Sequence, residues 1–300
     1  MKVLIVGAGG QGAPCASILA RGGGVSSIVL GDIDLDLANQ VKERIGSDKI
    51  TTIELDAGSI GEIERAAQGV DVVINLTLIR FNRNVMRAAL NSGAHYVDTA
   101  LGEPVWDQFV AGEPIFLDRE FTEAGLTALV GCGASPGITN VLARYASDKL
   151  DRVDKIRIRL GERELGETKA VSGWDPGWAP EIALTDYASP LPVFEDGRCV
   201  EYPPFSGVEE YEFPDPIGPV VIAHHCHEEA PLLGCFLGKG LGYCEFEYPV
   251  DPIGKVPEGY VRHGGSVELH GGSNQGSGDF VGRRWSGVYR RGRRVWRDSH

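Results

Sequence analysis

Residues Ile222 to Leu233, IAHHCHEEAPLL, place three histidines, one cysteine and two glutamates within six consecutive positions. Histidine titrates near neutral pH, so this segment can supply a general acid or base. A structural zinc site usually draws its four ligands from two paired segments, and no CxxC or second pair stands elsewhere. We therefore expect no metal. A catalytic site and a solvated strand end, with one histidine paired to Glu228 or Glu229, remain as alternatives.

A second group of residues that could bind a ligand lies near the N-terminus. The segment KVLIVGAGGQG, residues 2–12, is a short apolar run followed at once by glycines in a G-x-G-x-x-G pattern. In such a pattern Gly7 permits the turn, Gly9 lets backbone approach a pyrophosphate, and Gly12 lets the helix pack on the strand. The helix expected over residues 11–21 directs its N-terminal N–H groups at the phosphates. The predicted dinucleotide site begins with Gly7, Gly9, Gly10, Gln11 and Gly12.

The next apolar run, SSIVLGDID at residues 26–34, predicts a strand that ends in Asp32, twenty residues after Gly12. A carboxylate there can accept hydrogen bonds from both ribose hydroxyls of NAD and repels the extra phosphate of NADP. NAD is therefore favoured over NADP, and Ile33 joins the expected cofactor site. Asp32 could instead cap the following helix, but Asp34 and Asp36 are better placed for that.

The elements that must position these residues alternate along the first half of the chain. Apolar runs at residues 49–56, 70–77, 95–100 and 126–133 alternate with helical patterns, which predicts a parallel, doubly wound sheet. Ligands bind at the carboxyl ends of such strands. The remaining expected cofactor residues are therefore Asp56, Asn75, Leu76, Thr77, Asp98 and Thr99. For Asn75 and Asp98, turn or capping roles fit equally well.

Length and charge limit the classes of partner. A chain of 300 residues suits two domains. Its formal net charge of −13 disfavours nucleic acid and anionic membranes, which both need a positive field. Six cysteines without a CxxC pair predict reduced thiols. The sequence has neither the pattern of a signal peptide nor a run of 18 apolar residues, so we expect a cytoplasmic protein.

Five segments in order, VLIVGAGGQG, LGDID, VINLT, GAHYVDTA and GASPGITNVLARY, resemble the saccharopine dehydrogenase family over roughly residues 1–250. The glycine pattern occurs in many dehydrogenases, whereas HYVDTA together with PGITN is more specific. The resemblance implies NAD(P)-dependent oxidation of a carbon–nitrogen bond in a lysine-derived or polyamine-derived amine, followed by hydrolysis or cyclisation of the imine. It also implies a Rossmann domain at residues 1–136 and an α+β mixed-sheet substrate and dimerisation domain at 137–255, in a homodimer.

The same resemblance places candidate residues in the second half. The loop GASPGITN and the helix expected from Ile138 to Leu150 would offer unpaired N–H groups to a substrate carboxylate, unless this is a plain strand–loop–helix turn. The expected substrate-binding residues are Ser135, Pro136, Gly137, Thr139, Asn140 and Trp174. The expected catalytic residues are His224, His225 and Lys239. A packing role fits Trp174 equally well, and a position on the surface fits Lys239.

Residues 256–300 depart from the family pattern and are rich in Gly, Ser and Arg. Such composition buries little apolar surface, so we expect an irregular tail from a truncated or frame-altered end, or a basic tail for an acidic partner. A shortened substrate domain raises an alternative function, dinucleotide binding without catalysis. A sugar or semialdehyde dehydrogenase is a third alternative, which the charge of the accepted substrate would discriminate.

Overall fold

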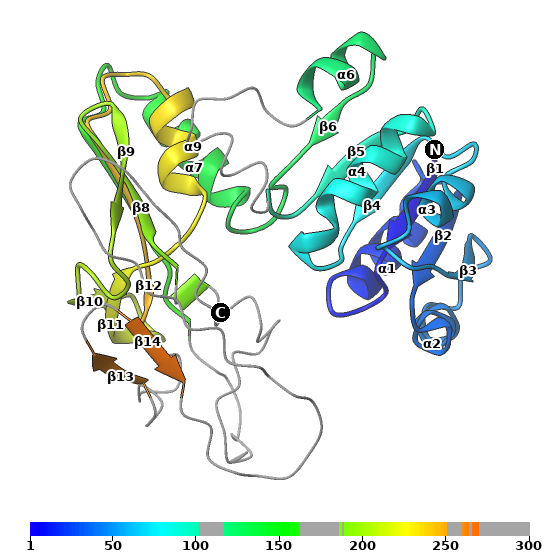
Figure 1. Cartoon of the computed structure of the whole chain (residues 1–300), viewed down its shortest axis with the longest axis horizontal. Coiled ribbons are helices and arrows are strands. Elements are labelled where there is room, and N and C mark those ends of the chain that lie inside the picture. Colours follow the sequence, from blue (N-terminus) through cyan, green and yellow to red (C-terminus); the bar gives the residue numbers. More distant parts are fainter. Residues whose placement is uncertain (102–116, 163–185, 188, 251–259, 264–265, 270–300) are drawn as a thin grey trace, which may run out of the picture. The chain divides into compact units, whose positions relative to one another are not determined.

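The computed structural model describes residues 1–101, 117–162, 186–187, 189–250, 260–263 and 266–269. The chain divides into two compact units, the first of residues Met1–Asp154 and Pro231–Leu241, the second of Lys155–Ala230 and Gly242–His300 (Figure 1). Most of the tail predicted at 256–300 lies outside the described residues. Within it, strands β13 (Tyr260–His263) and β14 (Ser266–Leu269) form an antiparallel pair.

The first unit contains a six-stranded sheet in the order β3-β2-β1-β4-β5-β6, and every pair of neighbouring strands is parallel. The strands are β1 (Lys2–Val6), β2 (Ser27–Asp32), β3 (Ile50–Glu54), β4 (Val72–Asn75), β5 (His95–Asp98) and β6 (Ala128–Leu129). The order reverses direction between β1 and β4, which is the switch point of a doubly wound sheet. The predicted Rossmann fold is confirmed.

Helices connect these strands where the sequence predicted them. They are α1 (Gly12–Arg21), α2 (Leu35–Ile45), α3 (Ile60–Ala66), the 3₁₀ turn η1 (Ile79–Phe81), α4 (Asn82–Asn91), α6 (Asp118–Glu123) and α7 (Ile138–Ser147). The Asp34 side chain caps α2 by accepting from the N–H of Leu37, as expected. Among the described residues, no helix is long and apolar enough to cross a membrane.

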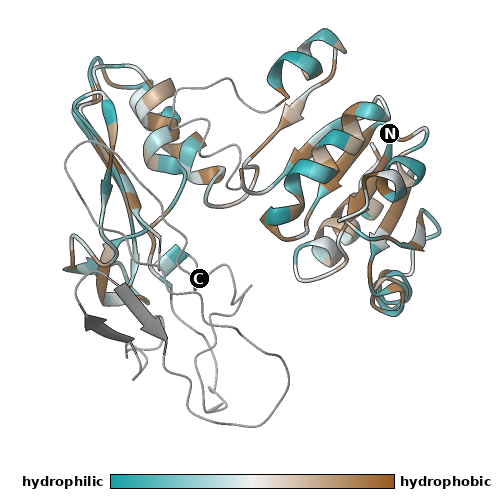
Figure 2. Cartoon of the chain, viewed as in Figure 1, coloured by the Kyte–Doolittle hydropathy of each residue, from teal (hydrophilic) through white to brown (hydrophobic). Residues whose placement is uncertain are grey.

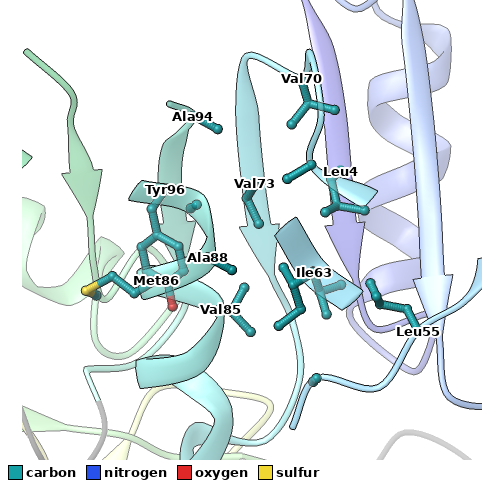
Figure 3. Packing of buried hydrophobic residues seen from close by; sticks show 14 of the residues in the cluster. Leu4, Leu55, Ile63, Val70, Val73, Val85, Met86, Ala88, Ala94 and Tyr96 are labelled. Atoms are coloured by element: carbon teal, nitrogen blue, oxygen red, sulfur yellow. The ribbon is translucent and has the colours of Figure 1, made fainter. Parts of the chain in front are cut away.

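Apolar side chains cover both faces of this sheet. Figure 2 shows the hydrophobic colours gathered on its strands, and Figure 3 shows one cluster in which Leu4 and Val73 of the strands meet Ile63 of α3 and Val85 of α4. Tyr96 of β5 lies in the same cluster and is completely buried. Burial of this kind is the main stabilising contribution to the fold. It also holds the strands in the alignment that brings their carboxyl ends to the same edge of the sheet.

The second unit is built on a mixed sheet in the order β10-β11-β12-β8-β9, with β7 paired in parallel to β12. Its strands are β7 (Lys155–Arg159), β8 (Leu191–Glu195), β9 (Arg198–Tyr202), β10 (Glu209–Phe213), β11 (Gly218–His224) and β12 (Tyr243–Pro249). Helix α9 (Glu229–Phe236) begins in this unit, and its residues from Pro231 onward belong to the first unit. Strands β8 and β9 form an antiparallel hairpin, whose turn residues Asp196 and Gly197 both have positive φ. The mixed second sheet is thereby confirmed.

Some boundaries differ from those predicted. Strand β6 is two residues long instead of spanning 126–133, because the N–H groups of Gly131 and Cys132 turn away to bond the side chain and carbonyl of Asp98. Helix α7 ends at Ser147, three residues before the predicted end at Leu150. Asp186 and Tyr187 are described and are helical, while the predicted substrate-binding residue Trp174 lies outside the described residues.

Candidate functional site

The glycine turn after β1 has the shape that a dinucleotide requires. A Cβ on Gly7 would lie 2.8 Å from the carbonyl oxygen of Leu76, and one on Gly12 would lie 1.8 Å from the oxygen of Gly7. These two glycines therefore permit close packing of backbone on backbone. Gly9 and Gly10 are exposed and a Cβ on either meets nothing within 4 Å. They leave an open backbone surface at the start of α1, which fits a pyrophosphate.

Asp32 stands beside this turn at the end of β2 and is half-buried. One carboxylate oxygen accepts from the N–H of Ala8 at 2.6 Å, and the other accepts from the N–H of Asp34 at 3.0 Å. Asp32 therefore organises the glycine turn, a role that its sequence position alone did not reveal. Each oxygen keeps a second lone pair, so the carboxylate is still chemically able to accept from ribose hydroxyls. Ile33, next to it, is 70% exposed.

Asp32→Ser is expected to shift cofactor preference from NAD toward NADP by at least about tenfold, because it removes the charge that repels a 2′-phosphate. Asp34→Ala is the matched control: it removes the α2 cap and is expected to cost about 1 kcal/mol of stability without changing preference. Cofactor titrations and urea unfolding of both variants check this. Equal ratios of NAD to NADP affinity in wild type and Asp32→Ser would count against the role of Asp32.

Two of the predicted strand-end residues take part in a buried polar network. Asn75 donates to Asn82 at 2.8 Å and to the hydroxyl of Tyr96 at 3.2 Å, and its oxygen accepts from Thr77. Asp98 accepts from the same tyrosine hydroxyl at 2.9 Å and from the N–H of Gly131. Burial, with the Asp98 charge, raises the pKa of Tyr96 well above its usual value, so the phenol stays a donor. The network favours the turn and positioning roles of Asn75 and Asp98.

The other predicted residues of this edge lie where their strands end. Leu76 and Thr77 contact Gly7 across the sheet, and the oxygen of Thr99 packs against Gly133. Asp56 is exposed and accepts from the N–H of Gly58 at 2.7 Å in the turn before α3. The parallel sheet brings Leu76 and Thr77 against the glycine turn, whereas Asp56 stabilises the turn that precedes α3.

The start of α7 differs from the expectation in one respect. The N–H of Gly137 donates to the side chain of Asn140 at 2.9 Å, and those of Ile138 and Thr139 donate to carbonyls of the preceding loop at 3.1 Å. The prediction of unpaired N–H groups is therefore wrong for these three, because the loop folds back on the helix start. A substrate role for Ser135, Pro136, Gly137, Thr139 and Asn140 stays a prediction.

Strands β7 and β12 of the second unit carry a ladder of buried ion pairs. Glu245 and Glu247 have side chains 2% exposed and meet the guanidinium groups of Arg157 at 2.6 Å and Arg159 at 2.8 Å. Cross-strand register places each glutamate directly opposite its arginine. The matching alternation of charge in KIRIR and CEFEY is the sequence signal that would have predicted this ladder.

His224 joins the ladder from β11. Its Nε2 lies 2.6 Å from Glu245, and its buried Nδ1 has no hydrogen-bond partner among the described residues. Burial acts to raise the pKa of Glu245, but hydrogen bonds from His224 and Tyr243 and the charges of His224 and Arg157 outweigh it and lower the pKa. The carboxylate therefore stays ionised and can stabilise a protonated imidazole.

Gly207→Ala is expected to cost about 3 kcal/mol of stability, because a Cβ would lie 2.5 Å from Nε2 of His224 at a φ of +67°. Gly197→Ala is the control, since Gly197 has a φ of +82° with nothing near its missing Cβ. Backbone strain alone predicts about 1 kcal/mol for it. Urea unfolding measures both, and equal losses would show that Gly207 does not hold His224 in place.

His225 and His227 follow His224 in the chain, and the centroids of their rings lie 6.2 Å apart. Burial and the neighbouring His227 lower the pKa of His225 to about 3, so this ring stays neutral. Burial acts to lower the pKa of His227 too, but its hydrogen bond with Glu229 outweighs that and raises the pKa. The predicted pairing with Glu229 is present, and Glu229 is completely buried, so the strand end is not a solvated one.

Lys239 belongs to the first unit and is exposed. Its ammonium group donates to the carbonyl of Leu150 at 3.1 Å, and its own carbonyl accepts from Val153. The structure thus gives Lys239 a local structural contact, and its catalytic role stays a prediction.

Two groups of ligand-type atoms each lie within 4.8 Å of one another, His224 with Glu245 and Glu247, and His227 with Glu228 and Glu229. In the first, two arginines already neutralise both carboxylates, which disfavours a further cation. In the second, all three residues come from one short segment, and the ring nitrogen is bonded to Glu229. The absence of a metal site remains our expectation.

Comparisons with known proteins agree with this geometry. Residues 3–129 match the saccharopine dehydrogenase NADP binding domain. The chain is 32% identical over 221 residues to a carboxyaminopropylagmatine dehydrogenase from Synechocystis, covering 71% of this chain and 54% of that one. It is 23% identical over 303 residues to a carboxynorspermidine synthase from Vibrio alginolyticus, covering 89% and 70%. The chain thus spans about half the length of the first relative.

A solved structure supports the fold. Saccharopine dehydrogenase (L-Glu forming) from Saccharomyces cerevisiae superposes with a TM-score of 0.63 at 18% identity, covering 82% of this chain and 54% of that one. The superposition is evidence of a shared fold, and the sequence matches are evidence of common ancestry. The sequence match shows that residues 3–129 form a domain of the saccharopine dehydrogenase NADP-binding type, which agrees with the open glycine turn.

Proposed function

We propose that this protein oxidises a carbon–nitrogen bond of an amino-acid-derived amine with a nicotinamide dinucleotide, preferring NAD. The observation that carries the proposal is the open glycine turn beside Asp32 in a domain of this family. The names of both relatives, carboxyaminopropylagmatine dehydrogenase and carboxynorspermidine synthase, contain a carboxylated amine, which supports a substrate with those two groups. The family description names NADP, whereas the charge of Asp32 favours NAD.

The chain's own residues would bind the cofactor and transfer protons to and from the substrate. The backbone of Gly9 and Gly10 would contact the pyrophosphate, and the carboxylate of Asp32 would accept hydrogen bonds from the ribose hydroxyls. When bound, the dinucleotide supplies the acceptor for the hydride that leaves the carbon next to nitrogen. The amine must first lose a proton from its ammonium form, so a base is required. The imine product then reacts with water, which gives a carbonyl compound and an amine, or cyclises.

His224 suits the role of base best among the three predicted catalytic residues. Its hydrogen bond with the ionised Glu245 would stabilise the protonated ring. His225 holds a proton poorly, because its pKa is lowered to about 3, mainly by burial. The Lys239 ammonium already donates to Leu150. We therefore assign proton transfer to His224, with Glu245 as the residue that positions it.

The test is turnover of wild-type protein with NAD and with NADP against L-lysine, saccharopine and carboxylated polyamines. The proposal predicts reduced nicotinamide with at least one such amine, and none with sugars or semialdehydes. Production of reduced nicotinamide from a sugar but from no amine would replace this function by a different dehydrogenase activity.

A further inference from the structure

A chain of buried side-chain hydrogen bonds lies at the carboxyl ends of β4 and β5 and leads to the hydroxyl of Thr77. Asn75, Asn82 and Tyr96, which form this chain, are each at most 4% exposed. The direction of every hydrogen bond in the chain follows from groups that can only donate or only accept. That direction decides which kind of ligand atom the Thr77 hydroxyl can bind.

The direction is set first at Asn82. Its Nδ2 lies 2.8 Å from the carbonyl oxygen of Ala100 and 3.3 Å from that of Leu101. A carbonyl oxygen only accepts, so the NH2 end of the Asn82 amide faces the two carbonyls and its Oδ1 faces Asn75. That oxygen also only accepts. Asn75 therefore donates to it from its own Nδ2, at 2.8 Å.

The orientation of Asn75 determines the role of Thr77. Because Nδ2 of Asn75 faces Asn82, Oδ1 of Asn75 faces Thr77 and accepts from its backbone N–H at 3.2 Å and from its hydroxyl at 2.6 Å. The single hydroxyl proton of Thr77 is thus used inside the protein, and its remaining lone pairs can only accept. Toward a ligand, the hydroxyl selects an O–H or N–H donor and excludes a phosphate oxygen.

Tyr96 of β5 (Figure 3) holds the Asn75 amide from a second side. The Tyr96 hydroxyl accepts from Nδ2 of Asn75 at 3.2 Å and donates to the carboxylate of Asp98 at 2.9 Å. Burial and then the Asp98 charge raise the pKa of Tyr96 well above its usual value, so the phenol keeps its proton. A reversed Asn75 amide would place oxygen against the acceptor oxygen of Asn82, so the observed orientation is the stable one.

Thr77 lies where a bound dinucleotide would pass from one half of the sheet to the other. Its Cγ2 is 3.3 Å from the position of a Cβ on Gly7, and its side chain is half-buried. In a doubly wound sheet the half with β1 to β3 takes the adenosine ribose, here at Asp32, and the half with β4 to β6 takes the other nucleoside. Thr77 follows β4, so the nicotinamide nucleoside would supply the donor.

We propose that the Thr77 hydroxyl accepts a hydrogen bond from the nicotinamide nucleoside, from either a ribose hydroxyl or the carboxamide N–H group. Tyr96 and Asn82 are positioning residues that hold the hydroxyl in this role through Asn75. The inference rests on the proposed function for the identity of the cofactor. It adds the direction of the hydrogen bond and two residues that the sequence did not single out.

The experiment measures the affinity of the full chain for NAD, ADP-ribose and ADP by calorimetric titration. ADP lacks the whole nicotinamide nucleoside, whereas ADP-ribose keeps its ribose. Thr77→Val, which has the same shape without the hydroxyl, should bind NAD about tenfold more weakly and ADP as wild type does. Thr77→Ser should retain most of the affinity for NAD. A loss with ADP-ribose as well assigns the donor to the ribose, and a loss with NAD alone assigns it to the carboxamide.

The positioning role is tested with Tyr96→Phe, which removes one hydroxyl from the buried chain. It should lower the ratio of NAD affinity to ADP affinity about three- to tenfold. A purely structural role would lower stability in urea unfolding and leave that ratio unchanged. Thr52→Val is the matched control, because the Thr52 hydroxyl donates to Asn39 at 2.6 Å on β3, away from the glycine turn, and its loss should not alter the ratio.

An unchanged ratio of NAD to ADP affinity in Thr77→Val, or an equal loss with both ligands, would overturn the proposal. An unchanged ratio in folded Tyr96→Phe would reject its positioning role. Failure of folded wild type to bind NAD would overturn this inference together with the cofactor assignment, whereas NAD binding that Thr77→Val leaves intact would reject this inference alone. None of these measurements requires an amine, so they are separate from the test of turnover.

Discussion

Gly9→Val is expected to weaken binding of the nicotinamide dinucleotide about 100-fold, or ~2.7 kcal/mol, while leaving the fold intact. The missing Cβ of Gly9 meets no atom within 4 Å, so the branched side chain can be accommodated without strain in the protein. It would instead occupy the open space above the turn, where a pyrophosphate would contact the backbone. Fluorescence or calorimetric titration with NAD measures the loss.

Two other glycines provide controls for this variant. Gly23 is exposed in the loop after α1 and also has nothing near a Cβ, so Gly23→Val should bind the cofactor like wild type. Gly12→Ala should instead unfold or strongly destabilise the protein, since its Cβ would lie 1.8 Å from the oxygen of Gly7. Wild-type affinity in Gly9→Val would contradict the placement of the pyrophosphate.

His224→Asn is expected to reduce kcat of amine oxidation by about 10²- to 10⁴-fold, the usual contribution of a general base. The affinity for the dinucleotide should not change, because the glycine turn is in the other unit. Glu245→Gln should lower kcat less, since it removes the charge that stabilises the protonated ring but keeps the base. Steady-state kinetics over a range of pH checks both variants.

A structural loss would give a different pattern. Glu245→Gln disturbs the ion pair with Arg157, so urea unfolding must accompany the kinetics. Asp196→Asn, in the exposed hairpin turn, should match wild type in both. Full kcat in a folded His224→Asn protein would remove His224 from the mechanism and direct attention to His227, whose pKa is raised by its bond with Glu229.

The first sheet was predictable because its signals are local. Each strand is a short apolar run, each helix has a 3.6-residue pattern, and Asp34 caps α2 as a side chain of its type does. The glycine turn was equally predictable from the sequence, because the close backbone contacts at Gly7 and Gly12 leave no room for a side chain. Strand β6 was overestimated because the bonds that shorten it run to Asp98, 33 residues earlier.

The second unit was harder to predict because its polar contacts join distant segments. HHCHEE predicted titratable chemistry, but not that His224 faces Glu245 or that His225 shares a pocket with Asp186. Those partners come from β12 and from a segment 39 residues before His225 in the sequence. Pairing register decides which side chains meet, and a single sequence does not specify it between strands so far apart.

The helix start at α7 illustrates the same limit. Pro136 and Gly137 predicted a turn beside a helix, which is present. The sequence did not show that Asn140 and the loop carbonyls would take the N–H groups expected to be unpaired. A substrate carboxylate would therefore have to be bound by side chains there, or elsewhere.

The most direct test of the central claim is the absorbance of reduced nicotinamide over time, with NAD and then NADP, against L-lysine, saccharopine and carboxylated polyamines. The account predicts a rising signal with one of these amines, faster with NAD than with NADP. A flat trace with every amine, from folded protein that binds the dinucleotide, would contradict amine oxidation and establish a dinucleotide-binding protein without this activity.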